Sequence, residues 1–387
     1  MPLPTARLRA ITPYVFSTLA EKKRARLATG ASVVDLSLGS PDQPMPGPIV
    51  EALAAAAHDP TRHGYPNFQG DLTFKKSFAG YLQRRFGVTV DPVTELVPTA
   101  GSKEALAHIV QTYCEEGDVL LVTDVAYPVY ERAAMAAGAE TVALPVSAEG
   151  DWWPDLQAVP ADVRRRAKLL VLNFPNNPTG ATTTLARLAE AVAFARDNDL
   201  IFVSDLAYSE LTFVGEPAPS VLQVPGALDV AIELYSGSKN FSMAGLRLGM
   251  VVGSAAFCRG LNGYRNLVGY GAPTVIQLAG AVAYDRAEEL SAGLRAGYLA
   301  RIAAACAGFA AGGHEVAGPL GGMYLWFRTP SGMSDWEATD TLIDRDGIIL
   351  TPGSGFGAGG AGYLRMSMVA DPAVLEAASR RVAALWG

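Results

Sequence analysis

Short apolar runs recur through the middle of the chain, and stretches with the spacing of amphipathic helices separate them. The runs have the length of buried strands and lie at residues 118–122, 167–172, 200–204 and 230–234. Helical patterns cover residues 72–86, 130–139 and 185–198. This alternation predicts an α/β fold in which helices cover both faces of a mostly parallel sheet, with the ligand at the carboxyl ends of the strands.

The pattern changes towards both ends of the chain. Near the amino end, a short helical pattern at 17–29 precedes a strand-like run at 33–38. Near the carboxyl end, an Ala-rich helical region precedes several strands and a last helix, at residues 275–311, 323–328, 347–351, 362–368 and beyond. We therefore predict an N-terminal arm with part of a small domain at 1–46, a large ligand-binding domain at 47–272 and a small C-terminal α+β domain at 273–387.

The composition is that of a globular enzyme. Half of the 387 residues are hydrophobic and 18% are charged, and this length suits two domains. The formal charge of -7 argues against nucleic-acid binding, which depends on basic side chains. The three cysteines form no CxxC pair and the four histidines lack ligand spacing, so we expect no metal and a reducing compartment. Because no signal peptide or membrane span is recognisable, we expect a cytoplasmic protein without a membrane partner.

The stretch from Ser236 to Gly249 carries the clearest chemical signal. Lys239 lies between two predicted strands, close in sequence to two serines and to Arg247. A lysine that is partly desolvated beside other positive charge loses its proton more readily, and its neutral amine can attack a carbonyl to form a Schiff base. The alternative is a solvated lysine in a surface loop.

Two further turns follow predicted strands. Ser102 and Lys103 begin a helix after a glycine, where free backbone amides and a hydroxyl form an anion site, although a plain helix cap is an equal alternative. Asn177 lies in a run of turn-forming residues that could be only a loop. Tyr127 follows a strand and could stack on a flat ring or simply pack.

Two charged residues occupy apolar strand patterns. Asp205 ends a predicted buried strand, where a carboxylate is costly unless a cation pairs with it; a helix cap is the alternative. Arg365 lies in the last predicted strand, and its planar fork matches a carboxylate with two parallel hydrogen bonds, although an internal ion pair is the alternative.

One familiar pattern is rejected. Residues 355–360 match GxGxxG, but a strand pattern follows them where a dinucleotide site requires a helix. We interpret this segment as a flexible loop over the site.

The pattern Ser-x-Ser-Lys-x5-Gly-x-Arg-x-Gly at 236–249 resembles the lysine signature of the fold type I aminotransferases of class I/II, which use pyridoxal 5'-phosphate. The resemblance extends over nearly the whole chain and is nearest to the LL-diaminopimelate aminotransferases and their bacterial relatives. Phe-Pro-Asn-Asn-Pro-Thr-Gly at 174–180 and Gly-Ser-Lys-Glu at 101–104 are similar to that group. Residues 240–247 and Thr274 depart from it.

The resemblance implies a role for each candidate residue. Lys239 would carry the aldimine, Asp205 would pair with the protonated pyridine nitrogen, and 47–272 would be the cofactor-binding domain. The other implied cofactor-binding residues are Ser102, Lys103, Tyr127, Asn177, Tyr208, Ser236, Ser238, Arg247 and, from a neighbouring subunit, Tyr65. The implied substrate-binding residues are Tyr14, Gly39, Asn177 and Arg365.

The implied activity is transfer of the amino group of an L-amino acid to a 2-oxo acid, with LL-diaminopimelate and 2-oxoglutarate as one candidate pair. The resemblance also implies a homodimer with shared active sites. Elimination, decarboxylation and oxidation start from the same aldimine and remain alternatives. A regulatory or ligand-binding protein that kept the fold is the alternative outside enzymes.

Overall fold

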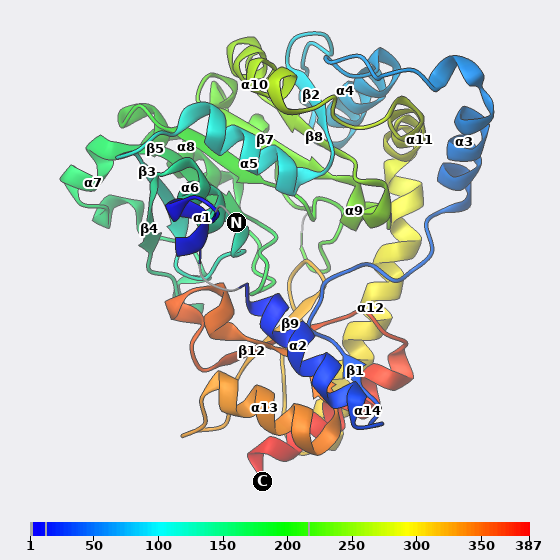
Figure 1. The fold of residues 1–387 in the computed structure, drawn as a ribbon, viewed down its shortest axis with the longest axis vertical. Helices are drawn as coiled ribbons and strands as arrows, with labels where there is room; N and C mark the ends of the chain where they lie inside the picture. Colours follow the sequence, from blue (N-terminus) through cyan, green and yellow to red (C-terminus); the bar gives the residue numbers. More distant parts are fainter. Residues whose placement is uncertain (1–2, 12–13, 216) are drawn as a thin grey trace.

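The computed structural model describes residues 3–11, 14–215 and 217–387. Figure 1 shows two lobes, one above the other. The large lobe is built on a seven-stranded sheet, and the small lobe is built on a three-stranded sheet. The long helix α12 (Ala287–Ala311) runs between them: Leu290 near its start packs in the large lobe, and Phe309 near its end packs in the small lobe.

The seven-stranded sheet confirms the predicted α/β class. Its order is β2-β8-β7-β6-β5-β3-β4, and only β8 runs antiparallel to its neighbours. The strands are β2 (Leu96–Thr99), β3 (Val119–Thr123), β4 (Glu140–Leu144), β5 (Ala167–Asn173), β6 (Ile201–Asp205), β7 (Ala231–Ser236) and β8 (Gly249–Val252). All residues of β3, β7 and β8 are buried, because helices cover both faces, and this burial produces the continuous apolar runs in the sequence.

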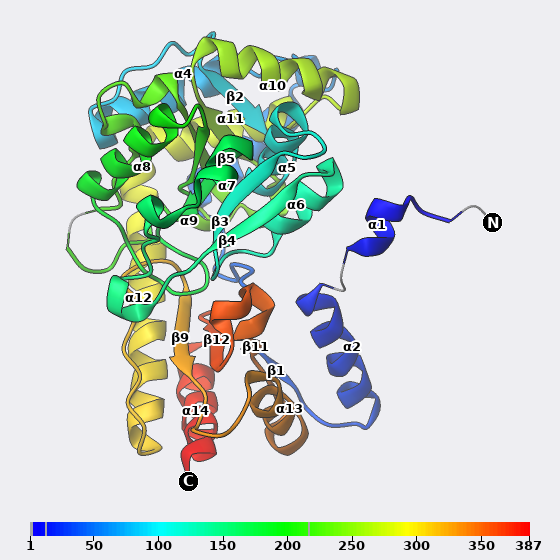
Figure 2. The same ribbon diagram turned by 90° about the vertical axis from the view of Figure 1, so that its left-hand side faces the viewer.

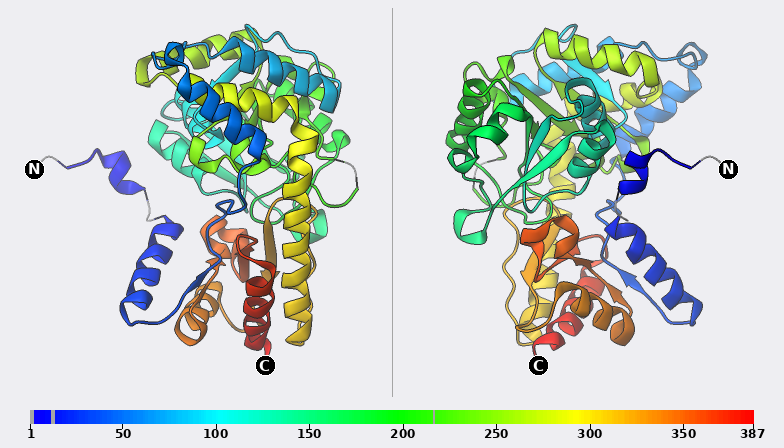
Figure 3. Two further views of the ribbon diagram at one scale, coloured as in Figure 1. Left: turned by 90° about the vertical axis from the view of Figure 1, so that its right-hand side faces the viewer. Right: turned by 60° about the vertical axis from the view of Figure 1, so that its left-hand side comes forward.

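Helices cover the two faces of this sheet in separate groups. One face packs against α5 (Ser102–Tyr113), α6 (Val129–Ala137) and α10 (Ala255–Val268). The other face packs against α8 (Leu185–Asp197) towards one edge, and against α4 (Leu72–Phe86) and α11 (Thr274–Asp285) towards the other. Alternate residues of β3 show the division, since Leu120 belongs to the first core and Leu121 to the second. Figure 3 shows these layers from two further directions.

The small lobe joins segments from both ends of the chain. Its antiparallel sheet has the order β11-β12-β9, formed by β9 (Tyr324–Arg328), β11 (Thr351–Pro352) and β12 (Tyr363–Ser367). The helices α13 (Asp335–Asp346) and α14 (Pro372–Ala383) pack beside it. The N-terminal segment, with α1 (Ala6–Ala10) and α2 (Val15–Ala28), extends along one side of the molecule in Figure 2. It joins the small lobe where β1 (Val34–Asp35) pairs in parallel with β10 (Ile348–Ile349).

Some predicted elements differ in detail. The single helical stretch expected at 275–311 is two helices, and the first of them, α11, packs on α3 (Gly47–His58) and α4 in the large lobe. The strand expected at 347–351 is divided between two sheets, because β10 pairs with β1 and β11 pairs with β12. The domain boundaries at residues 46 and 272 stay a prediction. Within the described ranges, no helix is long and apolar enough to cross a membrane.

Candidate active site

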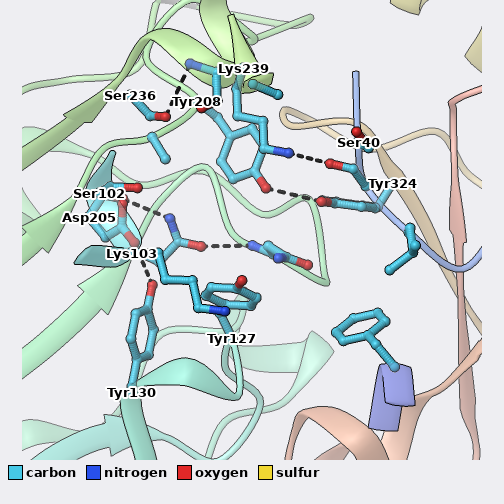
Figure 4. Close-up of a pocket in the computed structure, with 18 of the residues that line it drawn as sticks. Ser40, Ser102, Lys103, Tyr127, Tyr130, Asp205, Tyr208, Ser236, Lys239 and Tyr324 are labelled. Atoms are coloured by element: carbon cyan, nitrogen blue, oxygen red, sulfur yellow. Dashed lines mark hydrogen bonds between the residues drawn. The ribbon is translucent and has the colours of Figure 1, made fainter. Parts of the chain in front are cut away.

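A cavity of about 440 Å³ lies at the carboxyl ends of the large sheet, where the small lobe approaches it. Figure 4 shows the side chains that converge there from both lobes. Every residue that the sequence singled out lines this cavity except Tyr65. The others are Tyr14, Gly39, Ser102, Lys103, Tyr127, Asn177, Asp205, Tyr208, Ser236, Ser238, Lys239, Arg247 and Arg365.

Lys239 is carried by α9 (Gly237–Asn240), a single helical turn between β7 and β8. The Ser236 hydroxyl begins this turn by accepting the N–H of Ser238 at 3.3 Å. The Lys239 ammonium donates to the carbonyl oxygen of Gly39. Burial lowers the pKa of Lys239, and the nearby charges of Arg365 and Arg247 act in the same direction. The shift brings Lys239 closer to the neutral amine that a Schiff base requires.

Asp205 is a buried carboxylate with one oxygen free to bind a ligand. It ends β6, and its Oδ2 accepts the hydroxyl of Tyr130 at 2.8 Å. Its Oδ1 has no hydrogen-bond partner in the part of the chain that the structure describes. Burial raises the pKa of Asp205 to about 6, although Tyr130 and the nearby N–H of Ala207 oppose the rise. A cationic N–H in the cavity would relieve this cost, and a protonated pyridine nitrogen is such a group.

Asn177 is held between the sheet and the small lobe. Asn173, the last residue of β5, donates from its amide to the Asp205 carbonyl at 2.7 Å and accepts the Asn177 N–H at 2.9 Å. The Asn177 Oδ1 then accepts Nη1 of Arg365 at 2.7 Å. The loop predicted from its turn-forming residues thus holds Asn177 through Asn173 on one side and Arg365 on the other, and Asn177 lines the cavity.

Arg365 lies in β12 with only 1% of its surface exposed. Its guanidinium also donates to the Ser37 carbonyl, and its carbon lies 4.2 Å from the Tyr324 ring and 4.6 Å from the Phe356 ring. It forms no ion pair with a carboxylate among the described residues, so the internal ion pair considered from the sequence is absent there. A buried arginine in this position is suited to the carboxylate of a ligand.

The opposite end of the cavity is suited to a phosphate. Helix α5 begins at Ser102 after Gly101, and no side chain of the described residues caps its first N–H groups. Arg247 approaches the same turn, because a Cβ atom on Gly101 would lie 2.6 Å from its Nη2. Ser236 and Ser238 line the cavity beside it. Free amides at a helix start, hydroxyls and a guanidinium together form an anion site.

Three residues that the sequence analysis did not single out complete the cavity. Tyr130 donates to Asp205, Asn173 supports Asn177, and Tyr324 contacts both Tyr208 and Arg365. Tyr130 lies one helical turn after Tyr127 in Tyr-Pro-Val-Tyr, and that spacing was the available signal. The partner of Tyr324 is 116 residues away in the chain, so no local pattern pointed to it.

Tyr65 lies outside this cavity, with 84% of its side chain exposed. Its ring stacks on Tyr270 at 4.5 Å, and Tyr270 stacks on Phe68 at 4.7 Å. Leu267 is 83% exposed in the same segment as Tyr270. Within one chain, therefore, Tyr65 does not reach the site.

The segment at 355–360, expected to be a flexible loop over the site, forms two short 3-10 turns that pack on the large lobe. The Gly359 N–H donates to Asp124 Oδ1 at 2.5 Å, and the Ala126 N–H donates to the Phe356 carbonyl at 2.8 Å. A Cβ atom at Gly357 would lie 1.8 Å from the Asp124 carbonyl oxygen, so the glycine allows this close approach. The segment joins the two lobes and places the Phe356 ring against Arg365.

The site combines a buried lysine, a carboxylate with a free oxygen, an anion cradle and a carboxylate-binding arginine, which fits the chemistry of pyridoxal phosphate. Comparison with known proteins agrees: the model of the family "Aminotransferase class I and II" matches residues 31–382. The chain belongs to this family, and it is a pyridoxal-phosphate-dependent aminotransferase.

The relatives include enzymes of diaminopimelate metabolism. The chain is 41% identical over 375 residues to an LL-diaminopimelate aminotransferase of Aquifex aeolicus, covering 97% of each chain. Among solved structures, a substrate-bound BacF structure from Bacillus subtilis is 32% identical with a TM-score of 0.95, covering 100% of this chain and 98% of that one. A probable N-succinyldiaminopimelate aminotransferase from Thermus thermophilus is 36% identical with a TM-score of 0.90, covering 96% and 100%.

Proposed function

We propose that this enzyme transfers the amino group of an L-amino acid to a 2-oxo acid with Lys239 as the residue that moves the proton. The observation that carries the proposal is the position of Lys239, which is buried and lines one cavity together with Asp205 and Arg365. Pyridoxal phosphate, when bound, supplies a carbonyl for the lysine and an electron sink for the α-carbon.

Each end of the cavity has a separate task in this proposal. Ser102, Lys103, Ser236, Ser238 and Arg247 would hold the phosphate, and Tyr127 would stack on the ring. Asp205 Oδ1 would accept the ring N–H and keep that nitrogen protonated. Tyr208 and Asn177 would face the oxygen on the ring.

The substrate side of the cavity is formed largely by the small lobe and the arm. Arg365 and Asn177 would hold the α-carboxylate, while Tyr14 and Gly39 would border the substrate. This orientation presents the α-proton to Nζ of Lys239, which takes it as general base and returns it as general acid. Lys239 already donates to the carbonyl of Gly39, so its amine lies at the boundary between the cofactor and substrate sides.

LL-diaminopimelate with 2-oxoglutarate is the substrate pair that we propose to test first, because several relatives at 36–41% identity carry that enzyme name. Residues 240–247 and Thr274 depart from the pattern of that group, so the rate with LL-diaminopimelate has to be compared with the rates for other amino acids. L-aspartate and L-phenylalanine with the same oxo acid serve for this comparison. A rate for LL-diaminopimelate at or below both of them would contradict the substrate assignment.

The central test is spectroscopic. Purified protein should show a visible absorbance band that borohydride removes, and peptide mapping should find the reduced cofactor on Lys239. Lys239→Ala should lose the band and at least about 1000-fold in activity, since it removes the nucleophile and the proton carrier together. Addition of an amino acid without an oxo acid should leave the pyridoxamine form. Elimination, decarboxylation or oxidation would instead restore the starting band.

We also propose a homodimer in which Tyr65 completes the phosphate site of its partner. The supporting observations are its 84% exposure and the stacked rings of Tyr65, Tyr270 and Phe68 on the surface. Aromatic surface of this kind is typical of interfaces, and a two-fold interface would use the same patch on both chains.

Mixed dimers test the shared site. A dimer of one Tyr65→Phe chain and one Lys239→Ala chain would have one site with both residues intact and one site lacking both. Activity of the mixture above that of the two parent dimers together is expected. Activity equal to their average, or a fully active monomer by light scattering, would contradict the proposal.

A further inference from the structure

Tyr324 lies between Tyr208, Arg365 and Gly39, and none of the roles proposed above involves it. It is the first residue of β9 and is 2% exposed. Its hydroxyl oxygen lies 3.2 Å from that of Tyr208, and its ring lies 4.2 Å from the guanidinium carbon of Arg365. A Cβ atom on Gly39 would lie 1.9 Å from the same hydroxyl, so the absence of a side chain there makes room for it. Figure 4 shows Tyr324 facing Tyr208 from the opposite lobe.

The direction of the hydrogen bond between the two tyrosines follows from the role proposed for Tyr208. The two hydroxyl oxygens lie 3.2 Å apart, and either hydroxyl is able to donate. A Tyr208 O–H that points to the ring oxygen of the cofactor leaves only a lone pair of Tyr208 for Tyr324. In the cofactor-bound site, Tyr324 therefore donates to the Tyr208 oxygen.

This direction has a consequence for the proton of Tyr208. Each phenol has one proton, and the Tyr208 oxygen can accept from one neighbour while its O–H points to another. When Tyr324 donates, the Tyr208 proton is free to point into the cavity. Hydrogen bonds in such a chain strengthen one another in a buried site.

We propose that Tyr324 is a positioning residue that keeps Tyr208 as a donor towards the ring oxygen of the cofactor and links that donor to the carboxylate-binding Arg365. The proposal rests on the function proposed above and adds a residue to it. A carboxylate bound at Arg365 neutralises the cation over the Tyr324 ring, which weakens Tyr324 as a donor. Substrate binding is thereby linked to the basicity of the ring oxygen.

The titratable and charged groups that interact with Tyr324 come from both lobes and the arm. Any of them can change the apparent pKa of the visible absorbance, so the contribution of Tyr324 has to be separated from theirs. They are Tyr14, Tyr127, Tyr208, Lys239, Tyr298 and Arg365. Only Tyr208 is hydrogen-bonded to the Tyr324 hydroxyl among the described residues. A double-variant experiment on this pair isolates the proposed link.

The test is a pH titration of the visible absorbance of the holoenzyme. Tyr324→Phe keeps the ring and removes the hydroxyl, so the ring oxygen loses part of its stabilisation and the apparent pKa of the absorbance change should rise by roughly half a unit to one unit. Tyr208→Phe should raise it further, because it removes the direct donor. In the Tyr208→Phe background, Tyr324→Phe should add almost nothing.

Tyr284→Phe is the matched control. Tyr284 is a fully buried tyrosine of the large lobe that does not line the cavity, and its hydroxyl has no hydrogen-bond partner in the described part of the chain. Its substitution should leave the titration unchanged. A shift equal to that of Tyr324→Phe would assign the effect to general loosening of the core and would overturn the proposal.

The link to Arg365 is tested with succinate as a carboxylate probe. Tyr324→Phe should bind it within about twofold of the unsubstituted enzyme, whereas Tyr324→Leu, which removes the ring under the guanidinium, should weaken binding roughly tenfold. An unshifted titration in Tyr324→Phe, or a shift that persists undiminished without the Tyr208 hydroxyl, would overturn the role of Tyr324 alone. Absence of the absorbance band from the unsubstituted protein would instead contradict the proposed function.

Discussion

The two ends of the cavity are built in different ways. At the cofactor end, all the main residues follow strands of one sheet. Asp205 ends β6, Lys239 lies in the helical turn after β7, and Ser102 begins the helix after β2. At the substrate end, Arg365 comes from the small lobe, and its partners Ser37 and Asn177 come from the arm and the large lobe. One end therefore depends on a single rigid sheet, whereas the other exists only while three segments stay in contact. Substitutions at the two ends should fail in different ways.

The largest effect is expected at the cofactor end. Asp205→Asn replaces a buried carboxylate by a neutral amide, which cannot balance a protonated ring nitrogen. Loss of one member of a buried charge pair costs about 3–5 kcal/mol, so kcat/KM should fall about 1000-fold, with weaker cofactor binding. Steady-state kinetics and absorbance titration with the cofactor measure the two effects. Glu233→Gln, at a buried carboxylate of the adjacent strand β7 and outside this cavity, is the control. Equal losses in both variants would contradict the special role of Asp205.

The same substitution should have the opposite effect on the cofactor-free protein. Burial raises the pKa of Asp205 from 3.8 to about 6, so between these values the folded state holds a proton that the unfolded state has released. Stability is therefore lost as the pH rises through this window, by about 3 kcal/mol for about two units. Cofactor-free Asp205→Asn should be more stable to urea than the unsubstituted protein at pH 8, and the difference should vanish below pH 4. A difference that grows as the pH falls would contradict this reasoning.

A smaller and different effect is expected at the substrate end. Arg365→Lys keeps the charge but loses the planar fork that binds a carboxylate with two bonds. With a cost of about 2 kcal/mol, kcat/KM should fall about 30-fold, mainly through KM. The visible absorbance of the bound cofactor and its affinity should remain close to those of the unsubstituted enzyme. A loss of cofactor binding in this variant would show that the two ends are not separable.

The difference between the cofactor end and the substrate end also explains how much of the molecule could be predicted from the sequence. The strands ending at Asn173 and Asp205 were recognisable because a sheet buried on both faces requires continuous apolar runs, and polar residues at their ends are conspicuous. The family resemblance then suggested the individual roles. The substrate end gave weaker signals: β10 and β11 have two residues each, too few for a periodic pattern.

Contacts between segments far apart in the chain could not be predicted from local sequence patterns. Tyr130 donates to Asp205 across 75 residues, and Tyr324 meets Tyr208 across 116. A tyrosine in an apolar strand or helix has the same local sequence whether it packs in the core or donates a hydrogen bond to the site. A single chain also does not decide the role of Tyr65, since this residue is exposed and does not line the cavity of its own chain.

The short pairing of β1 with β10 has a practical consequence for anyone who produces this enzyme. These two residue pairs connect the N-terminal segment to the small lobe immediately before Ser37, whose carbonyl accepts a hydrogen bond from Arg365, and Gly39, whose carbonyl accepts one from Lys239. The segment from β1 to Gly39 therefore supports the active site directly. An affinity tag fused after Gly387, at the far end of the small lobe, leaves this connection undisturbed, whereas trimming the amino end past Asp35 would dismantle it.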